Sequence, residues 1–252
     1  MAKFKFLKIY KNKKIRYLFN SVPGDIYVVF LHGFKSDLEG DKPKTLLKYC
    51  KKNKIGFLGL EYSGHGKSYG KFEDGTISSW TEDVRKTIKK KLNKKKFIIV
   101  GSSMGGWIGL NLFKTFRNNI LAFVGISPAP EFLQRLMWNK FTEKIKKKLV
   151  REKFHIFKRG GFVYNISYNL IKDGRKNKIF NKNFNNKIFI TILHGQRDDV
   201  VPISISKKII KIFKKAKKKL IIIKNGDHSL SKKRNLKRLT QEISYIYNEL
   251  RP

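Results

Sequence analysis

Cysteine, acidic residues and long hydrophobic runs are scarce in this chain of 252 residues. The one cysteine, Cys50, excludes an internal disulfide framework and is typical of a reducing compartment. The longest apolar run, "IYVVFL" at 26–31, is far shorter than the roughly 20 residues that a bilayer-spanning helix requires. The amino-terminal "MAKFKFLKIYKNKK" lacks the apolar core of a secretory signal. We therefore expect a soluble, cytoplasmic protein.

The charge is strongly one-sided, because 58 Lys and Arg oppose only 18 Asp and Glu and give a formal net charge of +40. The lysines are spread along the chain, as in "KKKLNKKK" and "KIFKKAKKKL", mostly on expected solvent faces. There is no basic tail, zinc-ligand spacing or RNA-binding aromatic signature, so we expect no specific nucleic-acid partner. The abundant Lys, Ile, Asn and Phe indicate an AT-rich coding bias. Two interpretations stay open: solvated lysine faces, or attraction to an anionic membrane or acidic substrates.

Hydrophobic runs alternate with amphipathic segments over most of the chain. Strands are expected at 4–9, 14–19, 25–33, 55–63, 96–102, 120–128, 187–195 and 219–226. Helices are expected at 42–53, 79–92, 104–116, 203–215 and 229–250, with Ser79 as the N-cap of the second. Continuous apolar strands that alternate with helices predict an α/β fold, with a mostly parallel sheet covered on both faces.

The alternation breaks between residues 128 and 187. This region is expected to hold an amphipathic helix at about 131–150, a turn at "RGGFVYN" and another short helix. An insertion that covers the carboxyl edge of the sheet explains the break, and that edge is where open α/β sheets bind ligands. We predict a single domain over residues 1–252, with a lid insertion at 131–186.

A strand-to-helix turn in "FIIVGSSMGGWIGL" carries the first chemical signal. Only Ser103 has glycines two residues before and after it, because Ser102 has Val100 and Met104 at those positions. A nucleophile elbow needs a preceding strand, a following helix and small flanking residues, and this stretch has all three. The other interpretation is a turn of small residues without chemistry.

A serine nucleophile needs a base, and the base needs an orienting acid. In the chain order serine, acid, histidine, the base is expected at His228, in the loop after the last strand. His194 ends a strand and is expected to be a packed or capping residue. His155 falls in the inserted region, where a surface or local structural role is expected.

The acid is expected at the end of the strand before residue 203. "LHGQRDDVVP" offers Asp198 and Asp199, and the spacing from the histidine favours Asp198, with Asp199 expected to cap the turn. Asp227 is a weaker candidate, because adjacent side chains rarely reach the needed geometry. The remaining acidic residues make no metal-ligand cluster, so no metal is expected.

An oxyanion hole needs two backbone N–H donors. Met104, after the nucleophile, and Phe34, in the loop after the strand ending in "LHG", are expected to supply them. Apolar side chains near the nucleophile and in the lid suit an acyl chain, with lid-to-body packing as the alternative. They are Trp107, Phe132, Leu136, Met137 and Trp138.

These motifs resemble the α/β-hydrolase superfamily, and within it the mitochondrial palmitoyl-protein thioesterases, which also hydrolyse an acyl glucuronide, and their bacterial relatives. The similarity runs from about residue 27 to 246 and includes "HGFKSDLEGDK", "VGSSMGGWIGL", "LHGQRDDVVP" and "GDHS". It implies Ser103, Asp198 and His228 as a catalytic triad. The start of the sequence, which shows no presequence, favours a bacterial cytoplasm over a mitochondrial location.

The sequence therefore predicts a serine hydrolase of small-molecule or acyl-protein esters and thioesters, which acts through an acyl-enzyme and needs no cofactor. One alternative is an acyltransferase on the same fold. The other is a non-catalytic, polycationic binding protein.

Overall fold

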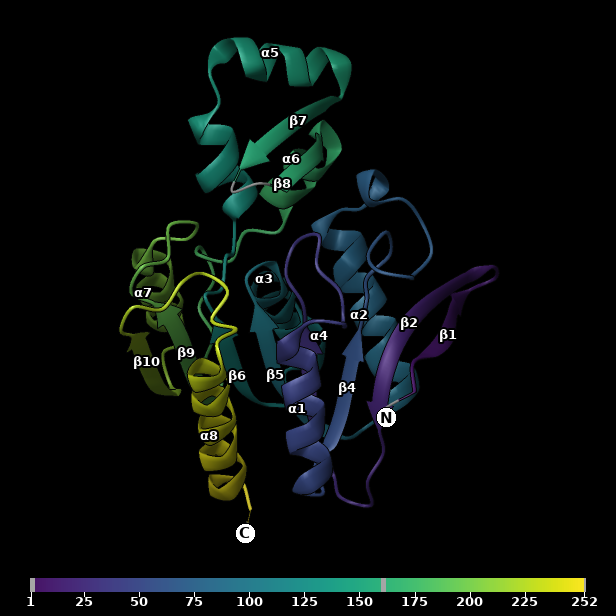
Figure 1. Cartoon of the computed structure of the whole chain (residues 1–252), viewed down its shortest axis with the longest axis vertical. Helices are drawn as coiled ribbons and strands as arrows, with labels where there is room; N and C mark the ends of the chain where they lie inside the picture. The colour runs from purple at the N-terminus through teal and green to yellow at the C-terminus, as the bar shows by residue number, and fades with distance from the viewer. Residues whose placement is uncertain (1–2, 160–161, 252) are drawn as a thin grey trace.

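The computed structural model describes residues 3–159 and 162–251 and contains an eight-stranded sheet in the order β1-β2-β4-β3-β5-β6-β9-β10 (Figure 1). β1 and β2 are antiparallel to each other and β2 is antiparallel to β4, whereas the other neighbours are parallel. The predicted α/β fold with a mostly parallel sheet is confirmed. The strand bounds are β1 Lys5–Tyr10, β2 Lys13–Asn20, β3 Ile26–Leu31, β4 Gly56–Leu60, β5 Lys96–Ser102, β6 Ile120–Ile126, β9 Phe189–Gly195 and β10 Lys217–Ile223.

Helices cover both faces of this sheet. Figure 1 shows α1 and α8 side by side in front of it. The helices that flank the sheet are α1 Asp41–Lys52, α2 Ile77–Leu92, α3 Met104–Asn111, α4 Phe113–Phe116, α7 Ile203–Ile212 and α8 Lys233–Glu249. In the part of the chain that the structure describes, no helix combines the length and apolar character needed to cross a membrane.

Side-chain alternation along the central strands builds two cores. In β5, Phe97 and Ile99 join the core under α2, α3 and α7, whereas Ile98 and Val100 join the core under α1 and α8. All four side chains are fully buried. A strand buried on both faces must be apolar at consecutive positions, which explains why these strands appear as unbroken hydrophobic runs.

Some helix ends differ from the expected ones. The helix expected at 79–92 begins at Ile77, and its N-cap is Thr76 rather than Ser79. The Thr76 hydroxyl accepts the N–H of Ser79 at 3.1 Å, while the Ser79 hydroxyl accepts the N–H of Thr76 at 2.8 Å. Ser79 is thus the third residue of a reciprocal capping box, a role more often taken by Glu or Gln.

Residues 133–176 form a layer at the upper end of Figure 1, whereas the chain after them returns to the main body, where Phe184 bridges Phe213. The single amphipathic helix expected at 131–150 is wrong. A π-helical turn, η2, is followed by a short 3-10 turn, η3, and then by α5, which the Thr142 side chain caps by accepting the Ile145 N–H at 3.3 Å. The bounds are η2 Leu133–Met137, η3 Trp138–Lys140, α5 Glu143–Glu152, β7 Phe154–Arg159, β8 Phe162–Ser167 and α6 Tyr168–Lys176.

The stretch expected to be a turn at "RGGFVYN" belongs to an antiparallel strand pair, β7 and β8. Its two glycines lie outside the described residues. The expected short helix is present as α6. Buried Glu131 fastens the start of the segment to its end, because one carboxylate oxygen accepts the N–H groups of Ile179 and Phe180 at 2.9 and 3.0 Å.

Glu61 is a buried carboxylate that organises the loop after β4. Its side chain is fully buried, 2.8 Å from the guanidinium of Arg16, and accepts the N–H of Lys67 at 2.8 Å and that of Leu38 at 3.2 Å. The "GHGKS" sequence, which resembles part of a phosphate loop, therefore folds around a protein carboxylate.

We expect Glu61→Ala to lower the free energy of unfolding by about 3–5 kcal/mol, because it leaves the buried Arg16 without its buried partner. Glu39→Ala is the matched control, since Glu39 also pairs with Arg16 but is 54% exposed. Loss of this exposed partner should lower stability much less than loss of Glu61. Urea denaturation of the two variants measures the difference, and equal losses would contradict this assignment.

Candidate active site

Ser103 lies in a sharp turn between β5 and α3. Its backbone is left-handed, with φ 51° and ψ −116°, a conformation that costs energy in a residue with a Cβ. The N–H of Ser103 donates to the carbonyl of Ile126 at 2.9 Å and ties the turn to β6. The turn also requires glycine, because a Cβ on Gly101 would lie 2.6 Å from the Cα of Gly106. The structure thus has the strained strand-turn-helix geometry of a nucleophile elbow.

A continuous hydrogen-bonded chain links three of the predicted residues. The Oγ of Ser103 is 3.1 Å from Nε2 of His228, and Nδ1 of His228 is 2.8 Å from Oδ2 of Asp198. His228 lies in the loop after β10 and Asp198 in the loop after β9, so three strand ends meet at one edge of the sheet. With Nδ1–H donating to the carboxylate, Nε2 is free to accept the serine proton.

The local surroundings of Asp198 keep it ionised. Its side chain is buried, and Oδ1 accepts the N–H groups of Val200 and Val201 at 2.9 and 2.8 Å. Burial raises the pKa of this carboxyl, but the hydrogen bonds from His228 and the backbone outweigh it and leave the pKa below its ordinary value.

Asp227, the weaker candidate for the acid, instead accepts the N–H of Leu230 at 2.8 Å, a turn-forming role.

His194 is a second histidine in contact with Asp198. As expected, it is a packed residue: it is fully buried, with Nδ1 2.7 Å from the Ser206 hydroxyl and Nε2 2.9 Å from the Val201 carbonyl. Its Nε2 also lies 3.3 Å from Oδ2 of Asp198, which the sequence did not reveal. Burial lowers the pKa of His194, so its imidazole is neutral. This neutral ring packs against the loop that carries Asp198.

The two predicted oxyanion donors lie on either side of Ser103. Met104 is the first residue of α3, so its N–H has no acceptor within the helix. The loop of Phe34 lies close to Ser103, because a Cβ on the preceding Gly33 would be 3.5 Å from Cβ of Ser103. Among the described residues, neither amide has a protein acceptor. Both are therefore available to an oxygen atom bound beside Ser103.

An aromatic cluster surrounds the half-buried Phe34 ring. Its centroid is 4.9 Å from Phe72 and 5.3 Å from Phe132. Phe132 in turn lies 5.8 Å from Trp107. Two of the five predicted lining residues, Trp107 and Phe132, thus lie together beside the loop of Phe34.

The other three lining candidates contribute mainly to packing of the inserted segment. Met137 is buried and Leu136 is half-buried against the same core. The ring of Trp138 packs on Tyr168 at 5.9 Å, and the guanidinium of Arg175 lies over it. The ring contacts of Trp138 are thus made within the inserted segment, and its place in a substrate site stays a prediction.

Two surface hollows of about 420 and 430 Å³ lie away from this site, one against β7 and α5 and the other beside α4. Ser103 lines neither of them. Across residues 3–159 and 162–251, no group of three or more His, Cys, Asp or Glu side chains could hold a metal ion.

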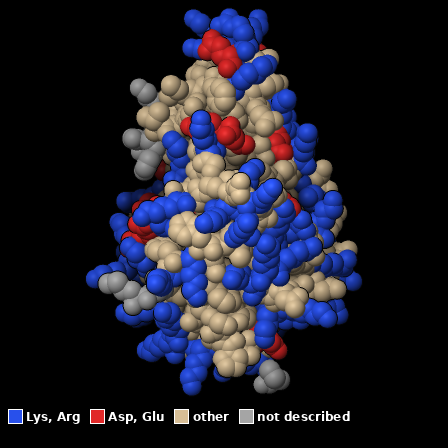
Figure 2. Space-filling view, turned by 90° about the vertical axis from the view of Figure 1, so that its right-hand side faces the viewer, with Lys and Arg blue, Asp and Glu red and all other residues tan. Residues whose placement is uncertain are grey.

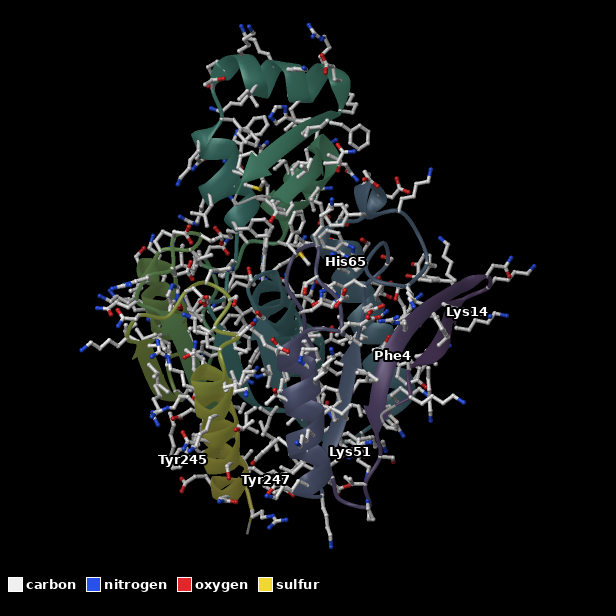
Figure 3. All side chains as sticks on the ribbon, viewed as in Figure 1. Phe4, Lys14, Lys51, His65, Tyr245 and Tyr247 are labelled. Atoms are coloured by element: carbon white, nitrogen blue, oxygen red, sulfur yellow. The ribbon has the colours of Figure 1, made fainter. Side chains whose placement is uncertain are left out.

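Two further buried histidines lie close to the elbow and were missed by sequence reasoning, which considered only histidines after the serine. His32 and His65 have ring centroids 5.1 Å apart, and in the described structure Nε2 of each has no hydrogen-bond partner. Figure 3 labels His65 just below the inserted segment. Burial lowers the pKa of His32 well below its ordinary value and lowers that of His65 to about 4. Both imidazoles are therefore neutral near pH 7.

Comparison with known proteins shows the family of this chain. Residues 26–157 match the family model described as the alpha/beta hydrolase fold, so the chain belongs to that family. Among curated proteins it is 27% identical over 227 residues to the mitochondrial palmitoyl-protein thioesterase ABHD10 of Bos taurus, covering 88% of this chain and 73% of the relative. A second curated match is a protein of Mycoplasma pneumoniae whose name describes an esterase/lipase. The two are 32% identical over 101 residues, which cover 40% of this chain and 37% of that protein.

Solved structures share the fold. A crystal structure of a protein from Agrobacterium vitis S4, described as a hydrolase, superposes with a TM-score of 0.91 at 26% identity and covers 98% of this chain and 99% of the other. The structure of alpha/beta hydrolase domain-containing protein 10 from mouse superposes with a TM-score of 0.89 at 23% identity, covering 99% and 100%.

Burial of His65 predicts a specific loss of stability in acid. The unfolded imidazole, with an ordinary pKa of 6.5, takes up a proton at pH values where folded His65, with a pKa of about 4, stays neutral. Acidification therefore favours the unfolded chain. Between pH 7 and pH 5, His65→Gln should lose about 2 kcal/mol less unfolding free energy than the wild type.

The readout is the pH dependence of chemical denaturation, because any substitution of a buried side chain changes stability at one pH. His32 remains in both proteins, and burial, the main cause of its lowered pKa, is the same in each. Parallel stability-versus-pH curves for wild type and variant would show that His65 does not carry this effect.

Proposed function

We propose that this hydrolase-family protein is a serine esterase or thioesterase that cleaves carboxylic esters or thioesters through an acyl-enzyme. The observation that carries the proposal is the hydrogen-bonded chain from Ser103 through His228 to Asp198, flanked by two unengaged backbone N–H groups. A serine hydroxyl alone is a weak nucleophile, and this arrangement supplies the base, the orienting carboxylate and the anion stabilisation that acyl transfer requires.

In the proposed reaction, the Ser103 Oγ attacks the carbonyl carbon while His228 Nε2 takes the hydroxyl proton. The tetrahedral intermediate places its oxyanion between the N–H groups of Phe34 and Met104. His228 then gives the proton to the leaving alcohol or thiol, and the Ser103 ester remains. Water, deprotonated by His228, attacks this ester and releases the acid. Asp198 stays ionised throughout and stabilises the imidazolium. The mechanism needs no cofactor.

The acyl side of the substrate is proposed to be apolar. The half-buried rings of Phe34 and Phe132 lie 5.3 Å apart and offer aromatic surface that suits a hydrocarbon chain better than a charged group, whereas the fully buried Trp107 packs against Phe132. The name of the bovine relative, a palmitoyl-protein thioesterase, supports the same class. In this reading the segment 131–186 is a lid, because it brings Phe132 over the loop of Phe34.

We expect a fluorophosphonate probe to label the wild type and not Ser103→Ala, because the probe reacts only with an activated serine. The same variant should lower kcat/KM for p-nitrophenyl esters by at least about 10,000-fold. Labelling is read on a gel and turnover by absorbance.

Ser102→Ala is the matched control, since it removes the neighbouring hydroxyl and should keep both labelling and turnover within a few-fold. Equal labelling of wild type and Ser103→Ala would exclude the mechanism. Product analysis with an added alcohol or thiol separates hydrolysis from acyl transfer, and absence of labelling in the wild type would leave a binding protein.

Phe132→Ala should lower kcat/KM for a dodecanoyl ester about tenfold relative to an acetyl ester, because it removes apolar surface from the proposed acyl site. Trp138→Ala, which deletes a ring that packs on Tyr168, should leave this ratio unchanged. Turnover of p-nitrophenyl esters and acyl thioesters of graded length gives the ratio. A ratio unaffected by Phe132→Ala would place the acyl chain elsewhere.

A further inference from the structure

The strand pair β7–β8 has one face inside the molecule and one face outside. In the register of the pair, His155 and Phe157 lie opposite Ile166 and Tyr164 on the inner face, whereas Phe154 and Ile156 share the outer face with Val163. The inner face is packed: the Phe157 ring lies 5.8 Å from Phe141, and the Tyr164 ring lies 5.6 Å from Phe34. The outer face has no comparable cover.

That outer face carries three exposed apolar side chains, and the polar Asn165 and Ser167 lie on the same face in the register. Phe154 is 42% exposed, Ile156 61% and Val163 51%. Eight large apolar side chains of the described residues are exposed, and four of these, the three just named and Val150, fall within residues 150–163. Single exposed apolar residues are ordinary, but several on one strand pair mark an interaction surface. We call Phe154, Ile156 and Val163 the apolar face.

The neighbouring elements are basic. Residues 140–153, which include α5, contain seven Lys and Arg against two Glu, a net charge of +5. The hollow of about 420 Å³ bounded by Phe154 and Ile156 is also lined by Lys148 and Glu152 of α5. Figures 1 and 2 show α5 at the extreme upper end of the molecule, where Lys and Arg form most of the charged surface. Lys148 of α5 thus adjoins the apolar Phe154 and Ile156 at this hollow.

We propose that the apolar face and the lysines of α5 together dock this protein onto an anionic lipid bilayer. Phe154, Ile156 and Val163 enter the boundary between headgroups and acyl chains, while lysines such as Lys144 and Lys147 contact the lipid phosphates. Charge complementarity selects anionic lipid, and the aliphatic side chains favour a bilayer over a nucleic acid, which offers phosphates but no hydrocarbon layer.

The docking face also connects to the candidate active site. The Nζ of Lys35 donates to the carbonyl of Val163 at 3.0 Å, and Lys35 follows Phe34 directly. Docking would therefore bring the loop of Phe34 close to the membrane surface, where acyl chains are anchored. The docking proposal does not depend on the proposed catalytic function, because vesicle binding is measured without turnover.

The test uses the full chain and vesicles of phosphatidylcholine with or without phosphatidylglycerol. We expect binding to the anionic vesicles and at least tenfold weaker partitioning for the double variant Phe154→Ser/Ile156→Ser, which keeps the charge. Ile222→Ser is the matched control, since Ile222 is 41% exposed on β10, and it should bind like the wild type. Lys144→Gln/Lys147→Gln should weaken binding more than Lys207→Gln/Lys208→Gln, which makes the same charge change on α7.

A fluorescence measurement locates the contact directly. The native thiol of Cys50 is fully buried and its pKa is raised to about 12 by burial, so an introduced cysteine is labelled selectively. An environment-sensitive dye on Ile156→Cys should shift to the blue with anionic vesicles, and the same dye on Ile222→Cys should not. Equal loss in the paired variants, equal shifts at both dye positions, or equal binding to neutral vesicles would overturn the proposal.

Discussion

The left-handed turn at Ser103 is the constraint on which the rest of the site depends. It persists because β6 accepts the Ser103 N–H through the Ile126 carbonyl. Gly105 also leaves no room for a side chain against the end of β3. Parallel strands end at one edge of the sheet, so this single turn sets the distance from Ser103 to the loops that carry His228 and Asp198. The backbone strain at Ser103 is offset by the packing of the strands that hold the turn in place.

Around this turn the protein buries polar groups in two different ways. Asp198 and Glu61 are buried as carboxylates because several donors converge on each of them. His32, His65 and His194 are buried as neutral rings, because burial disfavours their charged form. The buried polar groups around the site are therefore of two kinds. The carboxylates are paired with hydrogen-bond donors, and the histidines carry no charge near neutral pH.

The sequence was sufficient to predict those features whose determining contacts are local. The spacing of Gly101, Ser103 and Gly105 encodes a steric requirement of a strand-to-helix turn, and unbroken apolar runs encode doubly covered strands. It was insufficient where partners come from afar. The inner and outer faces of β7 both carry aromatic residues, so no alternation of polarity indicated the strand, and only a turn at "RGGFVYN" was predicted there. The inserted segment is also held by Glu131, which accepts the N–H of Ile179, and no local pattern encodes this contact.

The excess of positive charge has a consequence for how copies of this protein meet one another. An exposed face of Phe154, Ile156 and Val163 on a neutral protein would invite self-association. With a net charge of +40, two approaching molecules repel before their apolar faces touch, and the repulsion weakens only as salt shortens its range. The lysines thus oppose self-association, so that the exposed apolar face remains accessible to a partner of opposite charge.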